Sequence, residues 1–404
     1  MLWRGIGVLR IFMELHHSAN EYVQPLVVAL LGFPVISLLV LIPFAYRAYR
    51  RYGRLPMWRT CIFFSFLYYA LVVFFLTNWP FPAVTPGFCK FFRSDTNPQL
   101  DIFFIVKYLR DTVRPLTFWN IVSSFGGFQI LANVLLFLPL GVYLRYYFER
   151  SFAATVLIVC GTSFFLEMTQ LTGLWHLYPC PYRLFDVDDI LTNTLGGMIG
   201  YGLMMAMQRV RILPSARPGR RTYLPSVRVT RRLIAWVIDG TIVCLGALVA
   251  YLLLCSAIYA TTKMLPSVRM MPLIQHSLVF GVALLDFVVI PIVWNGVTIG
   301  KYVVALELVA EDQSVPSVAQ IVSNYSVLAL PVTILGVIQG GCIFMGWPFV
   351  ADTYIVMLQM TAVMLYVMPM FWRRYQDRPS LGRLVSRTVN VAMSRRQMRE
   401  FAQL

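Results

Sequence analysis

The chain of 404 residues is 58% hydrophobic and only 13% charged, and its mean hydropathy is +0.69. A soluble domain carries about 25% charged residues, so the composition excludes a water-soluble protein and predicts one whose solvent is lipid. The formal net charge of +16 would suggest nucleic acid in a soluble chain, but the basic residues lie in bursts between apolar runs, so we expect membrane lipids and no nucleic acid as partners.

Nine apolar runs predict an all-α fold, a polytopic membrane helix bundle of about nine transmembrane helices. A helix needs ~20 largely apolar residues to cross a bilayer. Five runs lie before residue 209 and four follow residue 231, which predicts a 5 + 4 arrangement. In chain order the runs span residues 22–46, 58–79, 128–144, 151–171, 188–207, 233–259, 277–294, 326–345 and 351–372.

Clusters of arginine predict the orientation and the domains. Five arginines follow the first run, and eight lie between residues 209 and 232 with no acid among them. Cytoplasmic loops are enriched in basic residues, so we expect this side in the cytoplasm, the N-terminus outside and the C-terminus inside. The predicted domains are residues 1–209 with five spans, a basic cytoplasmic linker at 210–230, residues 231–391 with four spans, and a cytoplasmic tail at 392–404.

Two basic segments have a predicted relation to the inner membrane surface. The linker at 210–230 either attracts anionic lipid, at ~1 kcal/mol per charge near the surface, or only enforces the topology. The tail from Arg373 mixes arginine with leucine and valine, which predicts a helix lying on that surface.

Two of the seven cysteines, Cys89 and Cys180, lie in polar connections that this topology places outside the cell. They could form a disulfide, although the sequence does not fix the distance between them. No CxxC motif or Cys/His spacing indicates zinc, and we expect no cofactor.

Polar residues gather at the outer boundary of the first domain, where each ionisable group inside a span needs a partner. In one interpretation Asp186 or Asp188 caps the fifth helix, and Arg183 pairs with Glu167. In a second, surplus carboxylates hold Ca²⁺ or Mg²⁺. In a third, the cluster is a recognition or catalytic pocket, although no Ser/His or Cys/His nucleophile accompanies it. The candidate residues are Asn133, Glu167, Gln170, Arg183, Asp186, Asp188, Asp189 and Asn193.

Several motifs of this region occur in the order typical of a known family. They are residues 133–141, Ser163 with Glu167 and Gln170, residues 178–189, and residues 193–197. On these motifs residues 22–209 resemble the VanZ-like family, which is named for a protein conferring low-level teicoplanin resistance. The resemblance implies a role at the plasma membrane and envelope of a bacterium, mostly Gram-positive, and it implies no reaction.

The second half carries a different pattern. Arg232 and Asp239 lie two helical turns apart on one face of the sixth span, and a motif at 295–301 follows the seventh. Residues 231–391 thereby resemble the RDD family. Some RDD proteins have been linked to sodium–proton exchange, but Gly382 stands where the second Asp is expected, which argues against transport here. The matching residues are Arg232, Asp239, Gly296, Thr298, Gly300 and Lys301.

Asp286 is a separate feature, because it lies in the middle of the seventh run. A carboxylate at this depth needs a partner on a neighbouring helix or is protonated. It either makes a structural interhelix hydrogen bond or belongs to a proton or ion relay.

Three function hypotheses follow. The first is a non-enzymatic envelope protein whose outer polar pocket binds or shields a cell-wall precursor or a lipophilic, teicoplanin-like antibiotic. The alternative is a transporter of ions or lipid through the RDD-like half. An intramembrane hydrolase is the weakest, since no nucleophile is apparent. The sequence does not predict the oligomeric state.

Overall fold

The computed structural model describes residues 2–92, 98–210, 227, 229–326, 329–346, 355–363 and 386–393. The chain forms two compact units. The first unit holds residues 1–37 and 57–219, and the second holds residues 38–56 and 220–404. The first helix, α1 (Leu2–Tyr52), therefore contributes to both units.

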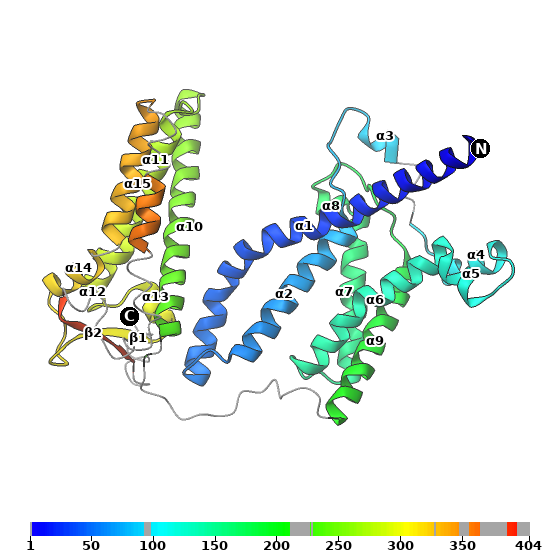
Figure 1. Ribbon diagram of the computed structural model, residues 1–404, viewed down its shortest axis with the longest axis horizontal. Coiled ribbons are helices and arrows are strands. Elements are labelled where there is room, and N and C mark those ends of the chain that lie inside the picture. Colours follow the sequence, from blue (N-terminus) through cyan, green and yellow to red (C-terminus); the bar gives the residue numbers. More distant parts are fainter. Residues whose placement is uncertain are drawn as a thin grey trace. The chain divides into compact units, whose positions relative to one another are not determined.

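The first unit is a bundle of long apolar helices that carries short helices toward one end (Figure 1). Three of the long helices start at a polar side chain, because Ser124, Ser151 and Asp186 each accept a hydrogen bond from a backbone N–H of the first turn. Besides the first part of α1, the long helices are α2 (Met57–Asn78), α6 (Phe125–Tyr146), α7 (Phe152–Leu171) and α9 (Val187–Arg209). The short helices are α3 (Phe88–Phe92), α4 (Phe104–Thr112), α5 (Phe118–Ser123) and α8 (Gly173–His176).

Glycines let α6 and α9 pack closely. A Cβ atom at Gly196 or Gly200 of α9 would overlap backbone carbonyl groups of α6. Gly141 of α6 faces the backbone of α9 in the same way. Small residues four apart allow helix backbones to approach, which is a common basis of helix association in lipid. The contact between α6 and α9 therefore depends on these glycines.

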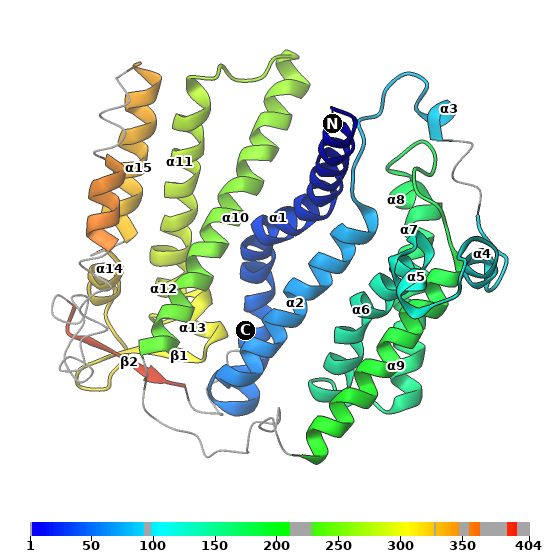
Figure 2. The same ribbon diagram turned by 45° about the vertical axis from the view of Figure 1, so that its right-hand side comes forward.

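The second unit combines apolar helices with a small antiparallel sheet. Figure 2 shows α10, α11 and α15 side by side, with the two strands near one end. Tyr49 of α1 packs on Ala235 and Ile238 of α10, and Leu306 pairs with Ala392 across the sheet. The elements are α10 (Val229–Thr262), α11 (Met270–Leu284), the π-helical turn η1 (Leu285–Val289), α12 (Ile290–Val293), α13 (Ile299–Val303), β1 (Leu306–Ala310), α14 (Val318–Ser326), α15 (Ala329–Phe344) and β2 (Thr388–Ala392).

The predicted all-α membrane bundle is confirmed. In the described ranges seven helices are long and apolar enough to cross a membrane, and they coincide with the first seven predicted runs. The eighth run contains the shorter apolar helix α15. Of the ninth, residues 355–363 are helical and the others lie outside the described residues. The structure thus supports seven of the nine predicted spans.

The helix expected in the C-terminal tail is wrong for Thr388–Ala392, which form strand β2. Val389 and Val391 alternate with polar residues, and a period of two suits a strand. The pairing partner, β1, lies about 80 residues earlier in the chain, so the tail alone does not reveal it. Gly382 and most of the tail lie outside the described residues.

The glycines of α9 can be tested with two alanine variants. Gly200→Ala should destabilise the first unit by about 1–3 kcal/mol, because the added methyl group overlaps the backbone of α6. Gly202→Ala is the matched control, since a Cβ atom there meets nothing within 4 Å. The thermal midpoint of the detergent-solubilised protein measures both. An equal effect of the two substitutions would contradict the close approach of α6 and α9.

Candidate functional site

A disulfide marks one end of the first unit, which we call the disulfide end. Cys89 and Cys180 are joined, with their Cα atoms 5.8 Å apart, so the pairing that the sequence left open is present. Phe88, Leu174 and Tyr182 form a buried aromatic and apolar cluster beside it. The loop between α7 and α9 is therefore fixed to the segment around α3.

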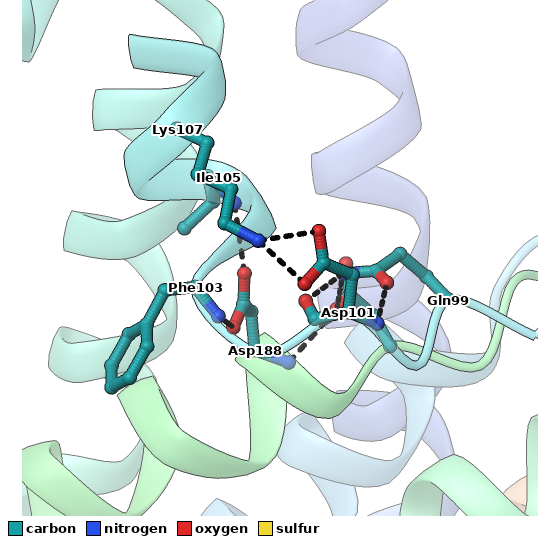
Figure 3. A network of polar contacts seen from close by, with 7 residues as sticks. Gln99, Asp101, Phe103, Ile105, Lys107 and Asp188 are labelled. Atoms are coloured by element: carbon teal, nitrogen blue, oxygen red, sulfur yellow. Dashed lines mark hydrogen bonds and ion pairs between the residues drawn. The ribbon is translucent and has the colours of Figure 1, made fainter. Parts of the chain in front are cut away.

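Asp186 and Asp188 act as helix caps at the disulfide end. The Asp186 side chain accepts from the backbone N–H of Asp188 at 2.9 Å and caps α9, as the first of the three interpretations predicts. The Asp188 carboxylate accepts from the backbone N–H groups of Phe103 and Ile105 at 2.7 and 2.8 Å, so it caps α4 (Figure 3). These two carboxylates already have structural partners.

Burial, together with the nearby Asp188 and Asp189 carboxylates, raises the pKa of Asp186 to about 6, although its hydrogen bond from the Asp188 N–H opposes the shift. Ionised carboxylates at this end therefore repel one another. A cation or a hydrogen-bond donor that reaches them is favoured.

Glu167, Gln170 and Arg183 connect neighbouring segments of the backbone. Glu167 is only 4% exposed and accepts from the N–H of Asp186 at 2.9 Å. Gln170 donates to the carbonyl of Thr77 at 2.7 Å, and Arg183 donates to the carbonyl of Trp79. Arg183 also lies within electrostatic range of Glu167. These three residues join α7 and the loop before α9 to the end of α2.

Asp189 has a different environment. Its Oδ1 atom accepts from the amides of Gln129 at 3.0 Å and Asn133 at 2.6 Å. In the described part of the chain, no hydrogen bond to the second oxygen, Oδ2, is formed. Asp189, Gln129 and Asn133 are all half-buried. We call these three residues the Asp189 site, which presents one carboxylate and two amide oxygens as acceptors.

Asn193 lies one turn beyond Asp189 on α9. It is 5% exposed and donates to Ser163 Oγ at 2.9 Å, which joins α9 to α7. Its own Oδ1 atom has no hydrogen-bond partner among the described residues. The structure therefore places all eight predicted residues of the first domain at one end of the unit. Six of them cap helices or join neighbouring segments, whereas Asn133 and Asp189 belong to the Asp189 site.

Gln129 is the residue that sequence reasoning missed. It lies four residues before Asn133, on the same helix face, and this spacing is the signal that could have found it.

The structure also bears on the metal interpretation. Within the described ranges, no group of three or more His, Cys, Asp or Glu side chains is placed to hold a metal ion.

A second polar cluster lies in the second unit around Asp239, which is 1% exposed. Asp239 accepts from Thr298 Oγ1 at 2.8 Å and from the backbone N–H of Gly300. A Cβ atom at position 300 would overlap the Asp239 carboxylate, so this contact requires glycine. The resemblance to the RDD family thus identified residues that meet in space.

Asp286 and Lys301 belong to the same cluster. Asp286 lies in the π-helical turn η1 and is 2% exposed, and both its oxygens lack a hydrogen-bond partner among the described residues. The Lys301 Nζ atom lies 4.6 Å from the centre of the Tyr325 ring. Asp239 is within electrostatic range of both groups. Turns of π-helix are frequent at functional sites.

Arg231, the residue before the predicted Arg232, makes buried contacts. Arg231 donates to the carbonyls of Val304 and Ala305 at 2.7 and 2.6 Å and lies 5.0 Å from the Tyr49 ring centre. Arg232 is half-buried and lies within electrostatic range of Lys301. Arg231 and Ala235 are both buried and lie four residues apart, on one face of α10. This spacing is the signal that could have identified Arg231.

The charge of Lys301 gives the second unit a pH dependence. Burial lowers the pKa of Lys301 from 10.5 to about 7, with Asp239 opposing the shift and Arg232 adding to it. An unfolded chain binds this proton more readily, so stability is lost as the pH falls toward 7. We expect a higher thermal midpoint at pH 9 than at pH 7, and a smaller difference in Lys301→Met. The same pH dependence in both proteins would contradict the assignment.

Comparisons with known proteins find two family domains in one chain. The VanZ/LLP1 family matches residues 64–208, and the RDD family matches residues 227–374. No curated protein and no solved structure matches the chain. The polypeptide is therefore a multi-pass membrane protein in which a VanZ/LLP1 domain is followed by an RDD family domain.

Proposed function

We propose that this protein lowers the susceptibility of a bacterium to teicoplanin-like glycopeptide antibiotics by binding or shielding a ligand at the outer leaflet of the plasma membrane. The VanZ/LLP1 match and the resemblance to VanZ-like proteins support an envelope role. The observation that carries the proposal is the Asp189 site, where a half-buried carboxylate keeps one oxygen without a hydrogen-bond partner in the described part of the chain.

The disulfide end is proposed to face outward. Disulfides persist in oxidising compartments and are rare in the cytosol, and Cys89–Cys180 lies at this end. The opposite ends of the long helices in the first unit carry Arg59, Arg145 and Arg209. By the positive-inside rule these arginines favour the cytoplasmic side. Both observations support the same orientation.

The acceptors of the Asp189 site indicate the chemistry of the ligand. The amide nitrogen atoms of Gln129 and Asn133 already donate to Asp189 Oδ1, which leaves the Oδ2 atom and the two amide oxygens. Such a set of acceptors, with one negative charge, suits an ammonium group or several N–H donors. A cell-wall precursor or a glycopeptide antibiotic with a free amine meets this requirement.

Substitutions at Asp189 test the proposal. Asp189→Asn removes the charge and keeps the shape, so we expect the minimal inhibitory concentration of teicoplanin to fall to that of cells without the protein. Asp101→Asn is the matched control, because Asp101 is an exposed carboxylate at the same end and forms an ion pair with Lys107 at 2.7 Å. Membrane levels of each variant are compared by immunoblot.

Glu167→Ala serves in the same assay as the control for a loss of folding. Glu167 accepts a backbone N–H in a buried position, so its loss should lower the amount of protein in the membrane. Wild-type resistance in cells that carry Asp189→Asn or Asp189→Ala at normal membrane levels would overturn the proposed role of the site.

A second function, movement of protons or ions through the RDD domain, is motivated by one observation. Asp286 and Lys301 are buried beside Asp239, and in the described ranges neither the Asp286 oxygens nor the Lys301 Nζ atom has a hydrogen-bond partner. Ionisable groups at such a depth are costly and often mark ion or proton pathways.

Reconstituted liposomes test this second function. A pH or sodium gradient should drive a flux that Asp239→Asn abolishes, because the substitution removes one of the two carboxylates. Asp312→Asn is a control, since Asp312 is exposed and its side chain accepts hydrogen bonds from Ser314. Sealed vesicles that show no flux with the wild-type protein would exclude it.

A further inference from the structure

We infer that residues 98–124, the α4–α5 segment, lie in the interfacial layer of the lipid bilayer beside the first unit, with their aromatic side chains among the lipid acyl chains. The inference concerns the partner of an exposed surface. It does not depend on the ligand of the Asp189 site, on teicoplanin resistance or on which side of the membrane the segment occupies.

The segment exposes an unusual amount of apolar surface outside the candidate spans. Phe118 is 71% exposed and Trp119 is 76% exposed. Water disfavours large exposed apolar side chains, and several of them in one segment normally mark an interaction site. The most exposed apolar side chains of the segment are Leu100, Phe103, Leu116, Phe118 and Trp119.

Helix α4 has three kinds of surface. Ile105 and Leu109 are buried and pack beside Gly126 at the start of α6. Phe104 and Val106 flank this contact and are exposed. Lys107, together with Arg110 and Asp111, occupies the face opposite the buried one. Helix α4 is therefore amphipathic, with its apolar side against the bundle and its charged side opposite, and Phe104 and Val106 are apolar side chains that the bundle does not cover.

Buried polar contacts hold the segment at a fixed depth. Asp188, in the first turn of α9, accepts the N–H groups of Phe103 and Ile105. Gln99 adds a short parallel bridge to Asp186. Helix α9 is a candidate span whose first residue is Val187. These contacts therefore place the segment at the level of that first residue, at one boundary of the span.

Polar and aromatic side chains around the Asp188 contacts point in different directions. In Figure 3 the Asp188 carboxylate points to the start of α4, and Lys107 reaches Asp101 within the same network. The Phe103 ring points away from these polar groups. The N–H groups of Phe103 and Ile105 are thus directed inward to Asp188, and the Phe103 ring is left to the surroundings.

Lipid is the occupant that suits this surface best. In Figure 1 α4 and α5 project sideways from the bundle of the first unit, and α4 packs against Gly126 at the start of α6. A bilayer around the candidate spans of this bundle would surround the segment as well. Trp and Tyr are enriched at membrane–water boundaries, and the segment carries Trp119 and Tyr108. Arg110 and Arg114 are exposed and lie in the same segment as these aromatic residues, so they can bind lipid phosphates at the boundary.

Spin labelling of the full-length protein in lipid nanodiscs tests the inference. The free cysteines Cys61, Cys160, Cys244, Cys255 and Cys342 are replaced by alanine, and the Cys89–Cys180 disulfide is kept. A nitroxide is attached to Phe118→Cys or to Trp119→Cys. Asp111→Cys, on the charged face of the same segment, is the matched control. Collisions with oxygen report the acyl chains, and collisions with a water-soluble nickel chelate report water.

At positions 118 and 119 we expect oxygen accessibility to exceed nickel accessibility several-fold, with the reverse at position 111. High nickel accessibility at all three positions would show that the segment lies in water and would overturn the inference. Low accessibility to both reagents at 118 and 119 would show that protein covers them, which also overturns it. If one labelled variant fails to fold, the other of the pair at 118 and 119 decides.

Discussion

In each half of the chain a buried carboxylate satisfies backbone N–H groups at the start of a short helix. Asp188 does so for α4, and Asp239 does so for α13 through Gly300. A short helix beside a membrane span exposes donors that lipid cannot satisfy, and each unpaired donor costs several kcal/mol. An aspartate on the neighbouring long helix removes that cost. These two contacts attach α4 to α9 and α13 to α10.

Close backbone contact accompanies Asp189 in the first unit and Asp239 in the second. Gly196 and Gly200 bring α9 against α6, which keeps Asp189 within reach of Asn133. Gly300 has the same effect in the second unit, where a side chain would displace the Asp239 carboxylate. The polar clusters therefore depend on residues that carry no polar group. A substitution at these glycines alters the electrostatics of a site without touching any of its charges.

Patterns of hydropathy predicted most of the long helices, because a span of about 20 apolar residues is a local property. The cap of α9 by Asp186 was also predictable, since the aspartate immediately precedes the helix. The partners of Asp188 were not. They are backbone groups of Phe103 and Ile105, more than 80 residues away, and neither side chain is polar. The strand β2 was missed for a similar reason, because its partner lies in a distant segment.

The boundary between the units in space differs from the boundary along the chain. Residues 38–56 pack within the second unit, where Tyr49 lies over Arg231 and Arg50 lies 5.0 Å from the Tyr302 ring centre. The RDD match begins only at residue 227. A fragment cut at the basic linker would leave both arginine–tyrosine contacts incomplete. The two domains thus share a helix that neither a truncation nor a gene fission could assign to one of them.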